Sequence, residues 1–248
     1  MDFSTSKAIL EYCNDNKIDI TEQKANQFEV LSDMLCDFNA HTNVTALKTK
    51  KDIAIKHFVD SIAVLKYDLI KKNAFVIDIG CGAGFPGLPI KMLRDDIHIT
   101  FVDSTAKKLK FTSLVAEQFG LENVKVCPNR AEELVNMGNR EVYDVAVSRA
   151  VASLPVLLEL VLPYVKPSGI FCAYKSSIEA DRNNKESELS KSMNALKKLG
   201  AKVECVLDAN LPDIDDVTQK HCIIVIKKTG KTPAGFPRRY AAIVKNPL

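Results

Sequence analysis

The chain has 248 residues, of which 46% are apolar and 26% are charged, and its net charge is +3. This composition is typical of a folded globular protein and excludes a disordered chain. No apolar run approaches the roughly 18 residues of a membrane-spanning helix, and the first residues lack a secretory signal, so we expect a cytoplasmic protein.

Seven cysteines are present, and no two of them have the Cys-x-x-Cys spacing. A small secreted protein would carry an even set that forms disulfides, and a zinc site would carry closely spaced Cys or His ligands. The sequence therefore predicts free thiols and no bound metal.

Residues 1–72 predict an N-terminal helical cap. Thr21 is a suitable N-cap, and apolar residues follow it at helical spacing as far as Phe38. The polar segment 39–43 ends this pattern, and a second amphipathic stretch begins at Asp52.

Residues 73–230 alternate between short apolar runs and helical patterns. This alternation predicts an α/β, Rossmann-like fold, in which helices cover both faces of a mostly parallel sheet. No helical pattern separates the last two of the seven predicted strands, so we expect the last strand to be antiparallel. The predicted strands are 74–77, 97–102, 124–127, 143–147, 169–174, 202–207 and 222–227, and the predicted helices between them are 88–94, 105–118, 153–164 and 179–198.

Residues 231–248 are expected to form a basic C-terminal tail. This asymmetry of charge indicates a polyanionic partner such as nucleic acid, although a solvated tail would give the same pattern. From residue 217 onward the chain has no acidic residue and seven basic ones, which are Lys220, Lys227, Lys228, Lys231, Arg238, Arg239 and Lys245.

The strongest local pattern is Asp78-x-Gly80-x-Gly82-x-Gly84, which lies between a predicted strand and a predicted helix. Glycines in this position allow a sharp turn and a close approach of the backbone to a nucleotide cofactor. Asp103 ends the next strand, 19 residues after the last glycine, where a carboxylate can accept hydrogen bonds from both ribose hydroxyls.

The charge of this loop distinguishes between two kinds of cofactor. A dinucleotide presents a pyrophosphate, which Asp78 would repel, whereas S-adenosylmethionine (SAM) presents a sulfonium and an ammonium group. The spacing Gly-x-Gly-x-Gly also differs from the dinucleotide pattern Gly-x-Gly-x-x-Gly. The sequence therefore predicts SAM as the cofactor and places Asp78, Gly80, Gly82, Gly84 and Asp103 in its site.

The end of the fourth predicted strand, Val147-Ser148-Arg149-Ala150, is where a methyl acceptor should meet the methyl group. This segment lacks an Asn-Pro-Pro-Tyr sequence, a Pro-Cys pair, and any carboxylate or histidine that could act as a base. A nucleophile with a free lone pair, such as a ring nitrogen, needs no base. Arg149 suits a guanine edge or a phosphate, and a salt bridge at the surface or between domains is the alternative.

Arg130-Ala131-Glu132 follows the third predicted strand. This loop approaches the adenine of the cofactor in folds of this kind, so Ala131 and Glu132 are candidate cofactor contacts. A purely structural role for Glu132, in which an acid in the first turn of a helix stabilises the helix dipole, is equally open.

These motifs resemble the bacterial 16S ribosomal RNA guanine-N7 methyltransferases (RsmG, also called glucose-inhibited division protein B). The resemblance covers most of the chain, with Cys81 and Lys220 as small departures; a lysine cannot reproduce the paired donors of the arginine that is usual at the second position. The similar segments are 38–39, 43–45, 57–61, 78–89, 103–104, 130–132, 148–153, 236–239 and 245–248.

The resemblance implies a class I SAM-dependent methyltransferase that modifies N7 of one guanine in the decoding-region loop of 16S ribosomal RNA. Arg130 and Arg149 are the catalytic residues that it implies. Guanine N7 carries a free lone pair, which agrees with a site that has arginines and no base. The cofactor contacts implied by position are Gly80, Phe85, Ala131, Glu132 and Arg149.

The partner implied is 16S ribosomal RNA or the small ribosomal subunit, and we expect a monomer without a membrane partner. The N-terminal helices, residues 48–51 and the basic tail are expected to face the RNA. Two other functions remain open, namely a small-molecule methyltransferase and a non-catalytic RNA-binding factor of ribosome assembly.

Overall fold

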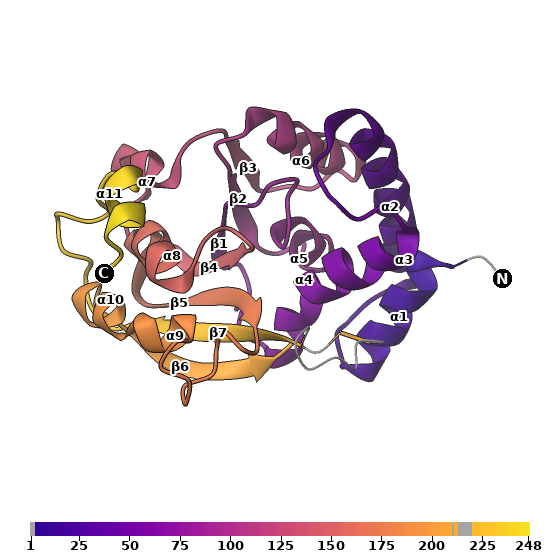
Figure 1. Ribbon diagram of the computed structural model, residues 1–248. Coiled ribbons are helices and arrows are strands. Elements are labelled where there is room, and N and C mark those ends of the chain that lie inside the picture. Colours follow the sequence, from indigo (N-terminus) through magenta and orange to yellow (C-terminus); the bar gives the residue numbers. More distant parts are fainter. Residues whose placement is uncertain (1–2, 210, 213–219) are drawn as a thin grey trace.

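Seven strands form a single sheet in the computed structural model, which describes residues 3–209, 211–212 and 220–248. The strands are β1 (Phe75–Ile79), β2 (His98–Val102), β3 (Val124–Cys127), β4 (Tyr143–Arg149), β5 (Val165–Ser176), β6 (Ala201–Asp208) and β7 (His221–Lys228). Their order in the sheet is β3-β2-β1-β4-β5-β7-β6 (Figure 1). The first five strands are parallel, and β7 pairs antiparallel with both β5 and β6. The predicted sheet and its antiparallel last strand are therefore confirmed.

Helices cover both faces of this sheet (Figure 1). The longer helices are α1 (Thr5–Asp15), α2 (Glu22–Thr42), α5 (Gly87–Leu93), α6 (Ala106–Gln118), α8 (Leu154–Val161), α10 (Met193–Lys198) and α11 (Tyr240–Lys245). The shorter segments are α3 (Lys50–Asp52), η1 (Ile53–Val59), α4 (Asp60–Ile62), η2 (Ala63–Tyr67), α7 (Ala131–Leu134), η3 (Val135–Asn139), η4 (Leu162–Tyr164) and α9 (Glu188–Lys191).

The central strands form because their side chains are apolar on both faces, as is usual for a parallel sheet between two helical layers. Adjacent residues of β1 show this division. Val76 belongs to one buried cluster and Ile77 to the other, and both are fully buried. The sequence of β1 therefore reads as a continuous apolar run rather than as an alternation.

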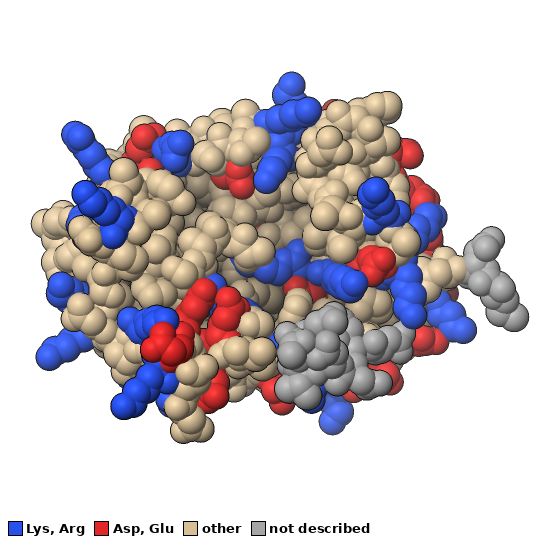
Figure 2. All heavy atoms as spheres, in the orientation of Figure 1, with Lys and Arg blue, Asp and Glu red and all other residues tan. Residues whose placement is uncertain are grey.

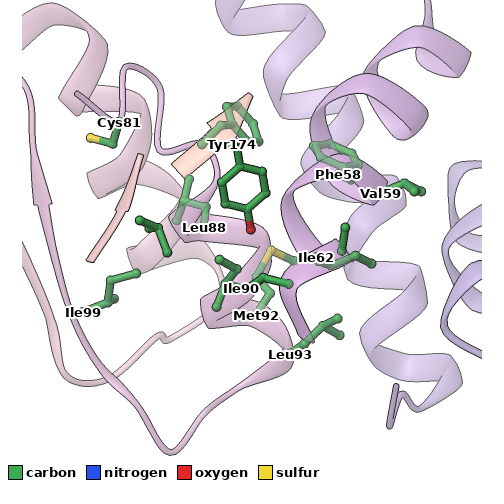
Figure 3. Close-up of a cluster of buried hydrophobic side chains, with 14 of the residues drawn as sticks. Phe58, Val59, Ile62, Cys81, Leu88, Ile90, Met92, Leu93, Ile99 and Tyr174 are labelled. Carbon is green, nitrogen blue, oxygen red and sulfur yellow. The ribbon is translucent and has the colours of Figure 1, made fainter. Parts of the chain in front are cut away.

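The N-terminal helices cover one face of the sheet together with α5 and α6. Phe58 and Ile62 of this layer lie near Leu88 and Ile90 of α5 in the same hydrophobic cluster (Figure 3). The hydroxyl of Tyr174, on β5, donates a hydrogen bond of 2.7 Å to the carbonyl of Ser61. Residues 3–72 consequently share their core with the sheet.

The helices α7, α8, α10 and α11 cover the opposite face. Their apolar residues join Phe171, Ile224 and Ile226 of the sheet in the second buried cluster. Ile243 of α11 is fully buried in this cluster, so the C-terminal segment packs against the domain.

The start of α2 is the one that the sequence predicts, but the helix continues through most of the segment 39–43 that was expected to end it. The Thr21 hydroxyl accepts a hydrogen bond from the N–H of Lys24, which caps the first turn. At the other end Asn43 has the left-handed conformation that often follows a helix, with φ +52°.

The predicted helix 179–198 is wrong as a single element. Residues 188–191 and 193–198 are helical, but the preceding segment forms turns. The side chains of Asp181 and Asn184 accept hydrogen bonds from the N–H groups of Asn183 and Glu186, at 2.8 and 2.9 Å. Such local bonds to the backbone compete with a helix, and they delay its start until Ser187 caps α9.

The cysteines are free, as predicted, and five of them are buried. Within the described part of the chain, no helix is long and apolar enough to cross a membrane.

Candidate active site

The glycine loop joins the end of β1 to the start of α5 and turns sharply. Gly80, Gly82 and Gly84 have φ values of +71°, +57° and +100°, which residues other than glycine rarely adopt. A Cβ on Gly80 would lie 2.3 Å from Cγ2 of Val151, so the segment after β4 closes directly over the loop. The predicted tight turn is therefore present, and Gly80 has a second, steric reason to be glycine.

A cleft of about 330 Å³ lies beside this loop, at the carboxyl ends of the parallel strands. In an open α/β sheet this is the position where ligands bind. Figure 2 shows that the molecular surface is hollowed at its centre, between α6 and α8 of Figure 1, with basic side chains on its rim. Of the predicted site residues, those that line the cleft are Gly80, Gly82, Asp103, Arg130, Ala131 and Glu132.

Asp103, which follows the end of β2, holds the glycine loop in place. One oxygen of its carboxylate accepts a hydrogen bond of 2.9 Å from the N–H of Gly82, and the other accepts one of 2.7 Å from the N–H of Thr105. A carboxylate has about four acceptor positions, so this group can also accept bonds from the hydroxyls of a ribose.

Asp78 does not line the cleft but lies buried beneath the loop. Its Oδ2 accepts a hydrogen bond of 2.7 Å from the N–H of Gly87, whereas its Oδ1 is buried without a partner. Burial raises the pKa of Asp78 to about 7, although the Gly87 N–H and Arg149 act in the opposite direction. A cation that reaches Oδ1, directly or through water, would find an acceptor already in place.

Arg149, at the end of β4, points toward the N-terminal helices and does not line the cleft. Its Nη1 lies 2.5 Å from Oδ2 of Asp60, and it also donates to the carbonyls of Lys56 and His57. The salt bridge that the sequence left as an alternative is therefore present. The contact of Arg149 with cofactor or substrate remains a prediction.

Asp60 is the centre of this network. Its second oxygen lies 2.8 Å from Nδ1 of His221 on β7, and the side chain is only 1% exposed. Burial raises the pKa of Asp60, but Arg149 and His221 outweigh that effect and hold the pKa below its usual value. The hydrogen bond with Asp60 raises the pKa of His221, although burial and the charge of Arg149 act in the opposite direction.

Phe85 and His57 connect the glycine loop to the same network. Their rings are stacked, with centroids 4.6 Å apart and 9° between the planes, and the Arg149 guanidinium lies 5.8 Å from the centroid of Phe85. His57 also bonds to Thr45 at 2.7 Å and to Arg149 at 3.0 Å. Burial and the nearby Arg149 charge lower the pKa of His57 to about 3, so this imidazole is neutral.

The loop after β3 forms another wall of the cleft, beside the glycine loop. Arg130 precedes α7, and the carboxylates of Glu132 and Glu133 fall in the first turn of that helix. The hydroxyl of Tyr164 donates a bond of 2.6 Å to the carbonyl of Ala131, which fixes the backbone there. Glu132 both lines the cleft and occupies the helical position that favours an acid, so both of its proposed roles agree with its place.

Three residues near the site, His57, Asp60 and Tyr240, were assigned no individual role from the sequence. His57 and Asp60 lie within the 57–61 motif, but nothing in their spacing indicates a bond to a strand end about 90 residues away. Tyr240 lines the cleft from the segment that the sequence describes only as a basic tail. Its neighbour Arg238 is bound to Glu159, and Lys228 to Glu141, so neither of these cations is free to face RNA.

The residues present fit SAM. The cleft has carboxylates at Asp103 and Glu132, a glycine at position 80 where a Cβ would not fit, and an unpartnered acceptor on the nearby Asp78. Sheet order, glycine loop and cleft together define a class I SAM-dependent methyltransferase.

The fold is similar to that of solved methyltransferases. A SAM-dependent methyltransferase from Aquifex aeolicus matches with a TM-score of 0.53 and 16% identity, over 75% of this chain and 97% of that chain. TYW2 of M. jannaschii, solved in complex with AdoMet, matches with a TM-score of 0.53 and 14% identity, over 68% of this chain and 75% of that chain. At these identities the likeness establishes the fold.

Sequence similarity identifies the family. The family described as rRNA small subunit methyltransferase G matches residues 24–208. Ribosomal RNA small subunit methyltransferase G of Clostridium botulinum (strain 657 / Type Ba4) is 38% identical over 237 residues, which are 95% of each chain. The protein of that name from Acetivibrio thermocellus is 39% identical over 244 residues, 98% of this chain and 96% of its own. The chain belongs to this family, which confirms the family, the fold class and the type of enzyme predicted from the sequence.

Proposed function

We propose that this protein transfers the methyl group of SAM to N7 of one guanine in the decoding-region loop of 16S ribosomal RNA. The family of the chain and its cleft support the cofactor and the class of substrate. The observation that supports the choice of a ring nitrogen is that the side chains of Ser148, His57 and Asp60, beside Arg149, are already engaged in bonds within the protein.

Bound SAM supplies an electrophilic methyl carbon on a positively charged sulfur. An in-line attack on this carbon requires a nucleophile with an available lone pair, and the protein contributes mainly position and electrostatics. N7 of guanine has such a lone pair and carries no proton. The acceptor therefore requires no general base.

The polar groups at the end of β4 agree with a site that does not remove a proton. The hydroxyl of Ser148 is buried and donates a bond of 2.7 Å to the carbonyl of Ile79. The carboxylate of Asp60 is paired with Arg149 and His221, and His57 is neutral between Thr45 and Arg149. These groups are arranged to hold one another rather than to accept a proton from a substrate.

Exposed lysines beside the cleft support a polyanionic substrate. Lys107 and Lys110 are exposed on α6, and Lys108 lines the cleft itself. Figure 2 shows basic side chains on both sides of the central hollow. Phosphate groups on either side of a guanine could contact this rim.

A transfer assay tests the function. Purified protein is incubated with labelled SAM and either small ribosomal subunits or deproteinised 16S ribosomal RNA, both taken from cells that lack this protein. We expect one labelled guanine in one of the two substrates. Because an N7-methylated guanine makes the RNA cleavable at that nucleotide after mild reduction, the position of the cut maps the modified base. Saturable SAM binding with no incorporation into either substrate would instead indicate a binding factor.

Salt dependence separates an RNA substrate from a small molecule. Binding of the RNA should weaken steeply and linearly on a log–log plot as salt rises, because each phosphate contact releases counterions. A small neutral acceptor would show almost no such slope.

A further inference from the structure

The C-terminal segment 236–248 is a fixed part of the fold. The Arg238 guanidinium binds the carboxylate of Glu159 on α8, with Nη2 2.6 Å from Oε2 and Nε 2.8 Å from Oε1. The backbone N–H of Arg238 donates to the same carboxylate at 2.8 Å, and the Glu159 side chain is fully buried. On the other side of this anchor, Ile243 is buried in the core. Tyr240 lies between these two fixed points.

Tyr240 lies at one end of the cleft. It lines the cleft together with Arg130 and Glu132, and the guanidinium carbon of Arg130 is 5.9 Å from the centroid of the Tyr240 ring. The sheet order β3-β2-β1-β4 places Arg130, after β3, at one end of the cleft and Val151, after β4, at the other. Tyr240 therefore belongs to the β3 end.

The charges along the cleft indicate which part of SAM lies at that end. Asp103, after β2, suits the ribose, and the loop at Gly80 with Asp78 beneath it suits the positively charged amino-acid part. With the amino-acid part at β1 and the ribose at β2, the adenine must lie toward β3. This is the end where the ring of Tyr240, 41% exposed, forms part of the wall.

We propose that Tyr240 is a cofactor-binding residue whose ring packs on the adenine of SAM, and that the segment 236–248 holds this ring in the wall of the cofactor site. Aromatic rings stack well on nucleobases, and a ring that is held in place beforehand loses little freedom on binding. This inference deepens the proposed function and rests on its cofactor, not on its RNA substrate.

Calorimetric titration of the full chain with S-adenosylhomocysteine tests the proposal without any transfer reaction. Tyr240→Ala should weaken binding about ten-fold, whereas Tyr240→Phe, which keeps the ring, should remain within two-fold of the original chain. Val244→Ala, on the same helix and 49% exposed, is the matched control and should have no effect. Thermal unfolding without ligand should be the same for all four proteins, because both positions lie at the surface.

A second ligand locates the contact. Methylthioadenosine keeps the adenosine and lacks the amino-acid part, so Tyr240→Ala should weaken its binding by the same factor. A loss of affinity for S-adenosylhomocysteine alone would place the ring near the amino-acid part of the cofactor rather than the adenine, and would overturn the proposal. Unchanged affinity of Tyr240→Ala for both ligands would overturn the role of Tyr240 alone. An original chain that binds neither ligand would overturn the cofactor itself.

Discussion

Arg149 and Asp60 form an ion pair between the end of β4 and the N-terminal cap, with 2.5 Å between Nη1 and Oδ2. Their side chains are 12% and 1% exposed, so the pair is shielded from water. The same guanidinium donates to two carbonyls of the cap and faces the ring of Phe85. The position of Arg149 at the carboxyl end of β4 therefore depends on the packing of residues 3–72 against the sheet.

Replacing Arg149 by lysine separates its charge from its shape. Lysine can still pair with Asp60, but it lacks the fork of donors that also reaches the carbonyls of Lys56 and His57. We expect affinity for S-adenosylhomocysteine to stay within about three-fold, while methyl incorporation into RNA falls at least ten-fold. Calorimetry and the labelled transfer assay measure the two effects.

Arg94→Lys is the control for this substitution. Arg94 likewise binds a carboxylate, that of Asp96, and the carbonyls of Ile70 and Lys71 in the cap, but it does not line the cleft. It should leave transfer unchanged. Loss of cofactor affinity in Arg149→Lys would instead place Arg149 in the cofactor site.

The two histidines of the network should give opposite dependences of stability on pH. The pKa of His57 is lowered to about 3, so the unfolded chain takes up a proton below pH 6.5 that the folded chain refuses, and stability is lost as pH falls. The pKa of His221 is raised by Asp60, so its contribution is present below pH 6.5 and is lost as pH rises through the folded pKa.

Urea unfolding of single variants at pH 5 and pH 8 checks these signs. The stability deficit of His57→Gln relative to the original chain should be smaller at pH 5 than at pH 8, by about 2 kcal/mol. The deficit of His221→Gln should be larger at pH 5 than at pH 8. Equal deficits at both pH values would mean that neither histidine titrates as its contacts indicate.

Gly80→Ala should damage the cofactor site beyond the cost of its backbone conformation. A positive φ alone costs about 1 kcal/mol for a residue with a Cβ, but here the Cβ also meets Val151 at 2.3 Å. We expect affinity for S-adenosylhomocysteine to fall at least ten-fold, because the loop or the segment after β4 must move.

Gly120→Ala provides the matched comparison. Gly120 has φ +59°, and nothing lies within 4 Å of an added Cβ. Its substitution should cost stability of about 1 kcal/mol and leave ligand affinity unchanged. Val151→Ala in the Gly80→Ala background should restore part of the affinity, and failure to do so would refute the steric explanation.

Cofactor affinity should depend on pH near neutrality through Asp78. Its pKa is raised to about 7, and the ammonium group of SAM or of S-adenosylhomocysteine favours the ionised carboxylate, so binding of either should weaken as pH falls from 8 to 6. Asp78→Asn should bind S-adenosylhomocysteine about ten-fold more weakly at pH 8, with little dependence on pH. A variant that keeps the slope of the original chain would assign the titration to another group.

Strands β1, β2 and β4 could be predicted from sequence because each is a short apolar run buried on both faces. The failure at 179–198 has the opposite cause, since Asp181 and Asn184 satisfy backbone groups locally and periodicity does not register such bonds. The glycine loop and Asp103 were predictable because each acts next to its own strand end.

The network around Arg149 could not be predicted in the same way. Asp60 reaches Arg149 only because the cap packs against the carboxyl ends of the strands. His221 belongs to β7, which comes much later in the chain and pairs with β5. Tyr240 is held at the cleft because Arg238, two residues earlier, binds the buried carboxylate of Glu159, which is 79 residues away in the sequence. Contacts of this kind depend on packing, which no local pattern records.

The shared core of cap and sheet has a consequence for synthesis of the chain. Phe28, Leu31 and Phe58 belong to the cluster that also contains Leu88, Ile99 and Val147, all of which are made later. During translation the N-terminal helices must leave the ribosome before the surface that covers them exists. Their apolar sides stay open until the first four strands have emerged, so a nascent chain of this length is where chaperone binding and aggregation should concentrate.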